Sequence, residues 1–372
     1  MPKQSSDIFV PGGTAIEFSK SGQKWTIEKG VEVGAVGTTI FSEFADSTLV
    51  NKGYIYSYAV YGAWFTGNNT TLVNKETGLI NGSQFGVLIS PNLATDIEGS
   101  VENYGKIFGG SAGIHNTAMP DFTVDNHGEI NGYAYGVHSL ALNVGSTPGQ
   151  VIKNFDSIKS DIYGIYVTSL ASLRSKVVNQ KDGVIEGGKI VDGGAAVFNG
   201  SGGLNLINKG KIKGDIWSPS SADNTVTNTG KIEGGVRLGS GDDELDNIDG
   251  RVTGYIWGAD GKDKLIAGDK KEKFVFDDLT DFDRVKNFES GKDKFFLDQA
   301  AFGTIGLGPL AKSAFRKGTE AEDADDRVIY HKDSGKLYVD DDGVDGNGPV
   351  QFAKVDPGQK LKYSDFTVEV FA

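Results

Sequence analysis

Two short loops rich in glycine and aspartate carry the residues best suited to bind a metal ion. They read Leu-Gly-Ser-Gly-Asp-Asp-Glu-Leu-Asp over residues 238–246 and Gly-Ala-Asp-Gly-Lys-Asp-Lys-Leu-Ile over residues 258–266. Glycine lets such a loop bend until its carbonyl oxygens face inward, the aspartate adds an anionic oxygen, and the leucine anchors the loop in a core. Ca²⁺ takes about 6–8 oxygen ligands, more than one loop offers, so two loops must share each ion. The predicted calcium ligands are Gly239, Gly241, Asp243, Gly258, Asp260 and Asp263.

Both loops lie in three consecutive blocks of twenty residues that together cover residues 211–270. An apolar residue recurs at the second and sixth positions of each block, and a glycine recurs at the fourth. The apolar residues are Ile212, Ile232 and Val252, then Ile216, Val236 and Ile256. The thirteenth position is Asp223, Asp243 and Asp263. We therefore predict that Asp243 and Asp263 lie one coil apart on the same side of a repeat structure, as shared ligands require.

A looser repeat precedes these blocks. An asparagine near a glycine is followed by isoleucine, as in Asn51-Lys-Gly-Tyr-Ile55 and Asn126-His-Gly-Glu-Ile130. Repeats of roughly 20–29 residues with one short alternating strand each are typical of a parallel β-helix. The asparagine has two interpretations: amides bonded along the stack, or ordinary left-handed turn residues. The repeated asparagines are Asn51, Asn74, Asn103, Asn126, Asn154, Asn179, Asn208, Asn228 and Asn247.

Composition agrees with strands joined by many tight turns. The 372 residues include 53 glycines and only 2 methionines, with many β-branched and aromatic residues. One coil cannot bury its apolar side alone, so stacked coils must form the core, and parallel crossovers are right-handed. We predict an all-β protein whose main part is a right-handed parallel β-helix. The predicted segments are an N-terminal cap and first coil over 1–35, the β-helix over 36–237, calcium-binding coils over 238–276 and a β-rich C-terminal module over 277–372.

From Leu238 onward the chain resembles the C-terminal region of serralysin-type and other RTX (repeats-in-toxin) proteins. The most specific match is Asp-Arg-Val-Lys-Asn-Phe-Glu-Ser-Gly-Lys-Asp-Lys over residues 283–294, where the family has D-x-I-x-D-F-x-x-G-x-D-K. Two departures are a short glycine–aspartate array, which implies few ions, and Asn287 in place of a common aspartate. Further matching segments are residues 274–276, 324–330, 335–338, 340–343, 350–353 and 365–372.

This resemblance implies a short RTX-type β-roll after the β-helix, and it implies Asp283 and Asp293 as additional calcium ligands. It also implies that the C-terminal residues are an uncleaved signal read by a type I secretion apparatus. The expected location is then outside a Gram-negative cell. The first residues, Met-Pro-Lys-Gln-Ser-Ser-Asp, lack the basic and apolar regions of a cleavable leader, which agrees with this expectation.

Several functional classes are disfavoured by composition. The chain has no cysteine, which excludes disulfides, thiolate metal sites and cysteine nucleophiles. Its net charge of −13 argues against nucleic acid as the main partner, and no apolar run reaches the length of a membrane span. The serralysin protease motif H-E-x-x-H is absent. We expect His115, His127 and His138 to be separate surface residues rather than one cluster.

We therefore expect a secreted, calcium-binding structural or adhesive protein whose partner is an extracellular polysaccharide or a cell-surface component. The alternative is a polysaccharide-modifying enzyme, although the N-terminal half has few acids and one arginine, Arg174. Such enzymes need clustered acids beside a base. A third interpretation is a self-assembling layer, for which uncapped coil ends would be the sign.

Two aromatic groups have both a structural and a ligand-binding interpretation. Tyr54, Tyr56 and Tyr58 alternate on one strand, and we favour an ordinary β surface, or the underside of a cap, over a glycan platform. The seventh positions of the blocks are Trp217, Arg237 and Trp257. Because the sixth position points inward, we predict that Arg237 stacks between the two indoles. The rival interpretation is a sugar site made of the same three residues.

Overall fold

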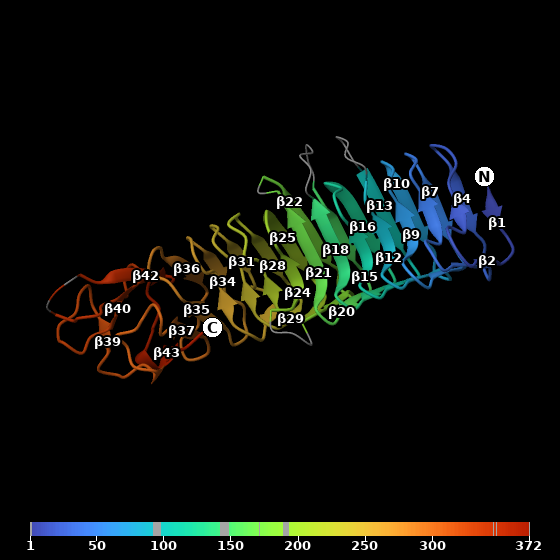
Figure 1. The fold of residues 1–372 in the computed structure, drawn as a ribbon. Helices are drawn as coiled ribbons and strands as arrows, with labels where there is room; N and C mark the ends of the chain where they lie inside the picture. Colours follow the sequence, from blue (N-terminus) through green and yellow to red (C-terminus); the bar gives the residue numbers. More distant parts are fainter. Residues whose placement is uncertain are drawn as a thin grey trace. The chain divides into compact units, whose positions relative to one another are not determined.

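The computed structural model describes residues 2–91, 98–141, 149–170, 172–188, 193–344, 346 and 348–371. Within these residues, β-strands are accompanied by a single 3₁₀ turn, η1 (Tyr363–Asp365), and no helix is long and apolar enough to cross a membrane. The chain divides into two compact units, unit 1 (Met1–Ile216) and unit 2 (Trp217–Ala372). Each unit contains coils of short strands stacked in parallel (Figure 1), so the predicted all-β parallel solenoid is confirmed.

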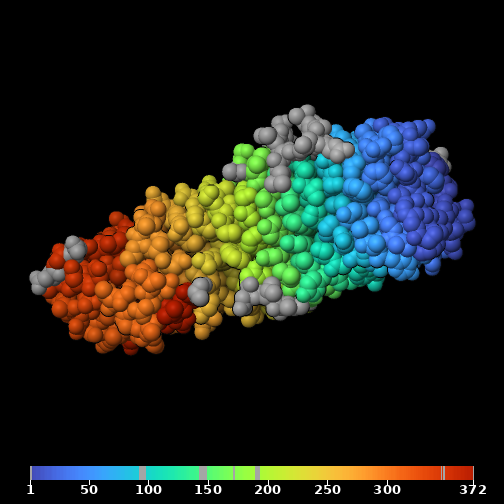
Figure 2. Space-filling model, viewed as in Figure 1, coloured from blue at the N-terminus to red at the C-terminus, as the bar shows by residue number. Residues whose placement is uncertain are grey.

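Each of the first eight coils of unit 1 contributes one strand to each of three parallel sheets, which we call A, B and C, and the ninth coil adds strands to sheets A and B. Sheet A contains β1 (Lys3–Gln4), β4 (Lys24–Ile27), β7 (Thr48–Asn51), β10 (Thr70–Asn74), β13 (Glu98–Asn103), β16 (Asp121–Asn126), β19 (Val151–Asn154), β22 (Arg174–Asn179) and β25 (Gly203–Asn208). Sheet B contains β2 (Ile8–Val10), β5 (Glu32–Ala35), β8 (Tyr54–Ser57), β11 (Leu79–Gly82), β14 (Lys106–Gly109), β17 (Glu129–Gly132), β20 (Ser157–Ser160), β23 (Val184–Glu186) and β26 (Lys211–Lys213). Sheet C contains β3 (Ile16–Glu17), β6 (Ile40–Ser42), β9 (Tyr61–Phe65), β12 (Phe85–Ile89), β15 (Ala112–Asn116), β18 (Tyr135–Ala141), β21 (Tyr163–Ser169) and β24 (Ala195–Asn199). In Figure 2 the surface of unit 1 passes in bands from blue to green, because each coil lies beside its neighbours in sequence.

The core of unit 1 consists of columns of aliphatic side chains that point into the coils. In sheet B, isoleucines at matching register positions follow one another through seven coils and are fully buried. This column is Ile55, Ile80, Ile107, Ile130, Ile158, Ile185 and Ile212. The inward direction of Ile212, which the alternation in its block predicts, is therefore confirmed, and the isoleucines of the preceding coils share it.

The asparagine markers form a continuous ladder at the end of the sheet A strands. Within unit 1, each amide nitrogen from Asn51 to Asn179 donates to the Oδ1 atom of the next marker at 2.8–2.9 Å. The seven side chains from Asn51 to Asn208 are fully buried, and none of them has a positive φ. The ladder interpretation is therefore correct and the left-handed turn interpretation is wrong. In unit 2, Asn228 donates to Asn247 at 2.6 Å in the same way.

Unit 2 begins with shorter coils and ends in a module that also contains antiparallel strands. β27 (Ile216–Trp217) includes the boundary between the units. The parallel strands are β28 (Thr225–Asn228), β29 (Lys231–Glu233), β30 (Val236–Arg237), β31 (Glu244–Asp246), β32 (Arg251–Val252), β33 (Ile256–Trp257), β34 (Lys264–Ile266), β35 (Lys273–Phe276), β36 (Asp283–Lys286), β37 (Lys294–Asp298) and β43 (Phe366–Glu369). The remaining strands are β38 (Gly308–Pro309), β39 (Phe315–Lys317), β40 (Val328–His331), β41 (Lys336–Val339) and β42 (Val350–Lys354), among which β40, β41 and β42 pair antiparallel.

Candidate functional site

A column of buried aspartates follows the starts of successive strands in unit 2. Asp243 precedes β31, Asp263 precedes β34 and Asp283 begins β36, and the register of these strands places the three residues one coil apart on the same side. Each carboxylate accepts a backbone hydrogen bond from the coil before it. The Oδ1 atom of Asp263 accepts from the Asp243 N–H at 2.8 Å, and that of Asp283 accepts from the Asp263 N–H at 3.0 Å. The predicted alignment of Asp243 and Asp263 is confirmed.

The first coil of unit 2 corrects one predicted register. Asp223 was expected to align with Asp243, but Thr225 pairs with Glu244, so Asn224 occupies the column. The Asn224 N–H and amide donate to the Asp243 Oδ1 atom at 2.6 and 3.0 Å. The loop that ends at Asn224 contains one residue more than the loop that ends at Asp243. An alignment of the twenty-residue blocks without gaps could not reveal this difference. Asp223 instead accepts a hydrogen bond from the Asp242 N–H at 3.0 Å.

The second oxygens of Asp243 and Asp263 are the atoms that point to a cation. Both Oδ2 atoms are buried and accept no hydrogen bond within the part of the chain that the structure describes. Burial raises the pKa of Asp243 to about 8 and that of Asp263 to about 7, and burial also raises the pKa of Asp283. A buried carboxylate requires a proton or a positive partner, because an isolated charge is costly in a medium of low dielectric constant. The column of Asp243, Asp263 and Asp283 therefore carries carboxylates that a cation could bind.

The loop glycines provide the space that these carboxylates need. A Cβ atom on Gly258 would lie 1.8 Å from the Asp263 Oδ2 atom, so only glycine fits beside this oxygen. Gly239 has a φ of 102°, a conformation that side chains rarely adopt, and a Cβ atom on Gly241 would approach the backbone of Ala222 to 2.7 Å. Asp260 is exposed on the outer part of its loop, where it accepts from the Ser240 hydroxyl at 3.2 Å.

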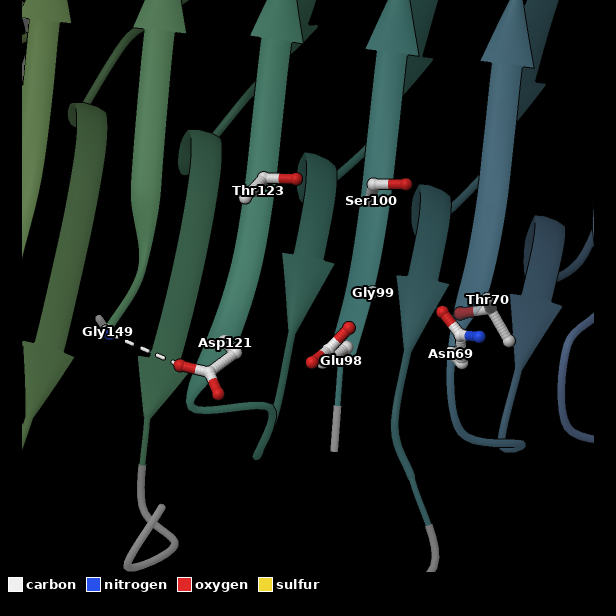
Figure 3. Close-up of a pocket in the computed structure, with 8 residues that line it drawn as sticks. All are labelled: Asn69, Thr70, Glu98, Gly99, Ser100, Asp121, Thr123 and Gly149. Atoms are coloured by element: carbon white, nitrogen blue, oxygen red, sulfur yellow. Dashed lines mark hydrogen bonds between the residues drawn. The ribbon is translucent and has the colours of Figure 1, made fainter. Parts of the chain in front are cut away.

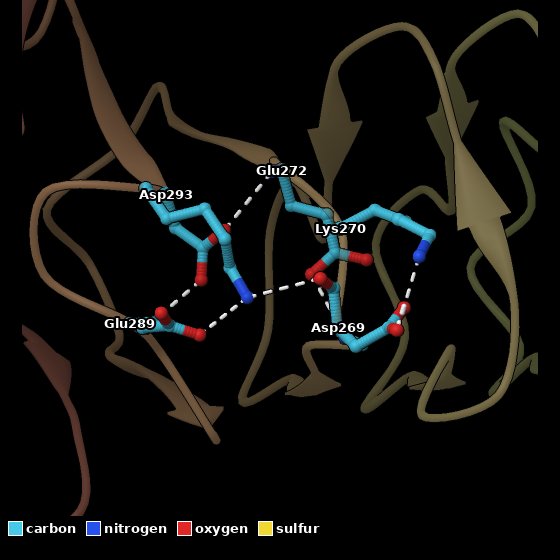
Figure 4. Close-up of polar contacts among 7 residues, drawn as sticks. Asp269, Lys270, Glu272, Glu289 and Asp293 are labelled. Carbon is cyan, nitrogen blue, oxygen red and sulfur yellow. Dashed lines mark hydrogen bonds and ion pairs between the residues drawn. The ribbon is translucent and has the colours of Figure 1, made fainter.

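Asp293 lies in a separate polar cluster of unit 2 (Figure 4). Its Oδ1 atom accepts from the Glu272 N–H at 3.1 Å and its Oδ2 atom accepts from the Glu289 N–H at 2.8 Å. The Lys292 ammonium forms an ion pair with Glu289 and donates to the Asp269 carbonyl oxygen at 3.1 Å. A lysine therefore already supplies positive charge in this cluster, and the case for calcium is stronger in the Asp243–Asp263–Asp283 column.

Arg237 and Trp257 are register partners on neighbouring coils of unit 2. The guanidinium carbon of Arg237 lies 5.5 Å from the centroid of the Trp257 ring, and the Nη2 atom lies 3.8 Å from the Asp277 Oδ2 atom. The Trp257 half of the predicted arrangement is confirmed, and stacking of Arg237 on Trp217 stays a prediction. A cation–π contact at an exposed site contributes about 0.5–1 kcal/mol.

We expect Arg237→Ala to lower the melting temperature of the protein by only about 1–4 °C, because the Arg237 side chain is 44% exposed. Differential scanning calorimetry in calcium measures this effect, and glycan binding is measured on the same sample. A loss of glycan binding with an unchanged melting temperature would assign Arg237 to a ligand site instead of to surface stability.

In unit 1, the outer side of sheet C carries rows of half-buried aromatic side chains, which we call the aromatic face. The strands from β9 to β21 repeat an X-Gly-apolar-X motif, as in Tyr135-Gly-Val-His138 and Tyr163-Gly-Ile-Tyr166. A Cβ atom on Gly136 would lie 2.6 Å from the Gly164 carbonyl oxygen, so glycine permits close stacking of these coils. The face consists of Phe41, Tyr61, Trp64, Phe85, His115, Tyr135, His138, Tyr163, Tyr166 and Phe198.

The rings of the aromatic face contact one another from coil to coil. Tyr61 stacks on Phe85 with centroids 5.5 Å apart, and Tyr135 stacks on Tyr163 at 5.6 Å. The strands β6 to β24 of sheet C contain no aspartate, glutamate, lysine or arginine, although 23% of the chain is charged. Sequence reasoning missed this face, which the recurring aromatic-Gly-apolar spacing could have indicated.

Two histidines meet within the aromatic face, contrary to the expectation of separate histidines. His115 and His138 are register partners, and their Nδ1 atoms lie 3.0 Å apart. His127 is elsewhere, stacked between Tyr104 and Phe155. The two histidines meet because both occupy the second X of the X-Gly-apolar-X motif, and this motif has the same register in β15 and β18.

The tyrosines of β8 form a local cluster on the outer side of sheet B. Tyr56 stacks on Phe9 and contacts Tyr54 and Tyr58. A Cβ atom on Gly34 would lie 2.2 Å from Tyr56, so this glycine gives the ring its place over the neighbouring coil. Tyr58 is 68% exposed. This arrangement agrees with the predicted β surface.

A polar cleft of about 260 Å³ opens at the start of the sheet A strands (Figure 3). Glu98 and Asp121 are register partners on its floor, and the Asp121 Oδ1 atom accepts from the Gly149 N–H at 3.2 Å. The described lining contains two carboxylates and no basic side chain. The lining residues are Asn69, Thr70, Glu98, Gly99, Ser100, Asp121, Thr123 and Gly149.

Comparison with known proteins adds no assignment: no protein-family model matches the chain, and no curated protein matches it. The fold is therefore that of a parallel β-solenoid, and the RTX resemblance depends on the motifs quoted above. The chemistry of the site must be argued from its own residues.

Proposed function

We propose that the protein is a secreted, calcium-binding β-solenoid with a structural or adhesive function. The observation that carries the calcium proposal is the pair of buried, unpartnered Oδ2 atoms on Asp243 and Asp263, one coil apart. Carboxylate and carbonyl oxygens are the ligands that Ca²⁺ prefers. Asp243, Asp263 and Asp283 would hold the ion, together with carbonyl oxygens of the loops that contain Gly239, Gly241, Gly258 and Asp260. Bound calcium would neutralise the buried negative charge and so stabilise the coils.

The aromatic face supports a neutral polysaccharide as the ligand. Its strands carry no charge, so an anionic chain finds no cationic partner there. Tyrosine combines an apolar ring with a hydroxyl, which suits the apolar faces and hydroxyls of sugars. Coils follow one another at about 4.8 Å, close to the advance of one sugar in an extended pyranose chain, so successive coils can contact successive sugars.

We expect Tyr163→Ala to weaken binding of neutral polysaccharide about tenfold, since an aromatic contact contributes about 0.5–1.5 kcal/mol beyond its buried area. A glycan array, read with calcium and with chelator, identifies the ligand, and titration calorimetry measures the variant. Tyr58→Ala, which removes an exposed ring just after β8 of sheet B, is the matched control and should bind normally. Equal loss in both variants, or preference for polyuronates, would contradict this assignment.

Export by a type I apparatus remains part of the proposal, on the strength of the C-terminal motif. Removing residues 364–372 should leave the protein inside a host that carries a matching exporter. These residues include β43, whose Phe366 is buried and pairs with Phe295, so the truncated protein is also tested for folding by its calcium-dependent melting. Normal secretion of the truncated chain would refute the export signal.

A polysaccharide-modifying activity is the second candidate, and the cleft of Glu98 and Asp121 is the observation that favours it. Paired carboxylates can act as general acid and base on a glycosidic bond. Glu98→Gln would then abolish release of reducing ends or unsaturated sugars from a bound polysaccharide. Binding without any product in the wild-type protein would leave the adhesive function as the better account.

A further inference from the structure

We propose that His115 and His138 form a binding site for a transition-metal ion of the copper, nickel and zinc class, on the aromatic face of unit 1. The two residues come from β15 and β18 and are direct register partners. Their Nδ1 atoms lie 3.0 Å apart. An ion bound at about 2.0–2.1 Å from each nitrogen would bridge this gap with an angle near 90° at the metal.

The neighbouring rings hold both imidazoles in place. His115 stacks on Phe85 with centroids 4.7 Å apart, and His138 stacks on Tyr135 at 4.2 Å. Tyr166 packs edge-on against His138 at 4.8 Å. Ligands fixed by packing lose little conformational entropy when they bind an ion. The pair is therefore organised in advance, unlike two histidines on flexible loops.

The chemistry of the pair suits borderline metals rather than calcium. Burial lowers the pKa of His115 to about 4, and burial with the proximity of His115 lowers that of His138 to about 3. Both rings are then neutral at physiological pH, and the proton that the two Nδ1 atoms share in their contact must move to an Nε2 atom for both Nδ1 lone pairs to bind an ion. Imidazole nitrogen favours copper, nickel and zinc, whereas calcium requires hard oxygen ligands. Water would complete the coordination on the solvent side.

Neighbouring coils supply substitutions that preserve the packing. The register position of His115 is occupied by Leu88 on the preceding coil, and that of His138 by Tyr166 on the following coil. His115→Leu and His138→Tyr therefore place side chains that this column already accommodates. His127→Tyr, in the separate Tyr104–Phe155 stack, removes a more exposed imidazole and is the control for copper binding by a histidine outside the pair.

The test is titration of the full-length protein, without a polyhistidine tag and saturated with calcium, with Cu²⁺. We expect one equivalent bound with two nitrogen ligands in the electron paramagnetic resonance spectrum. His115→Leu and His138→Tyr should each weaken copper binding by at least about tenfold, because disturbing even an outer partner of a metal ligand costs that much. The controls His127→Tyr and Asp263→Asn should bind copper normally. Copper binding of equal affinity in the wild-type protein and in the His115→Leu/His138→Tyr double variant would overturn the proposal.

Discussion

We expect calcium to raise the melting temperature of the protein by roughly 10 °C over its value in chelator. Ligand that binds only the folded state at a thousand times its Kd adds about 4 kcal/mol, and a domain of this size gains about 2–4 °C per kcal/mol. The ion would occupy the column of Asp243, Asp263 and Asp283, whose buried charge otherwise opposes folding. Calorimetry in calcium and in chelator measures the difference, and identical melting in both would refute the calcium proposal.

Asp263→Asn tests the effect of the ion separately from the hydrogen bonding of the coil. The asparagine carbonyl can still accept the Asp243 N–H, which now donates to Oδ1 at 2.8 Å, but the buried charge is removed. In chelator at pH 8 the variant should therefore melt above the wild-type protein, and in calcium it should melt below it. Asp249→Asn, which removes an exposed carboxylate from the same unit, should keep the full calcium response.

The pH dependence of the calcium-free protein has a definite sign. The pKa of Asp243 is about 8 in the folded state, far above the value of about 4 in an unfolded chain. The folded state therefore binds the proton more tightly, and this stabilisation is complete below about pH 4 and is lost as the pH rises to about 8. The gain in stability from calcium should grow over the same interval.

The second large effect is the loss of one member of the asparagine ladder. Asn126→Ala should destabilise unit 1 by about 3 kcal/mol, because buried polar groups without partners cost about 1–3 kcal/mol each. The Asn126 amide donates to Asn154 Oδ1 at 2.8 Å, and its Oδ1 atom accepts from Asn103 at 2.8 Å and from the Gly128 N–H at 3.3 Å. Urea denaturation followed by circular dichroism measures the change.

Asn131→Ala provides the matched comparison for the ladder. Asn131 lies five residues further along the same coil, in β17, and is half-buried on the outer side of sheet B. Its loss should change the free energy of unfolding by less than about 0.5 kcal/mol. Equal destabilisation by both substitutions would mean that the coil tolerates any change poorly and that the ladder has no special role.

The repeats predicted the fold because each coil buries the same types of side chain at equivalent positions. Isoleucines such as Ile130 and asparagines such as Asn126 stand at inward positions of the coils from Asn51 to Asn208, so their spacing alone reveals the strands and the stacking. The aspartate column was also predictable for Asp243 and Asp263, whose loops have equal length. The preceding loop has one residue more, and only three-dimensional pairing shows that Asn224 replaces Asp223.

The meeting of His115 and His138 could have been predicted from the asparagine markers, because each histidine lies twelve residues after its marker, Asn103 or Asn126. The 23 residues between the histidines equal the 23 between these markers, a register that the expectation of separate surface residues did not use. Outward positions also vary among coils, from Leu88 to Tyr166, because no shared core constrains them. The binding sites that we propose in unit 1 therefore use the less regular side of each strand.

The asparagine ladder also has a consequence for how such a chain can change over time. Successive members are separated by 23 to 29 residues in unit 1, yet every one of them reaches the same place in the stack. Each coil is thus realigned at its asparagine, and a lengthened loop does not displace the coils that follow. Insertions can accumulate coil by coil without disturbing their neighbours, which makes the scaffold open to duplication, loop grafting and the acquisition of new ligands.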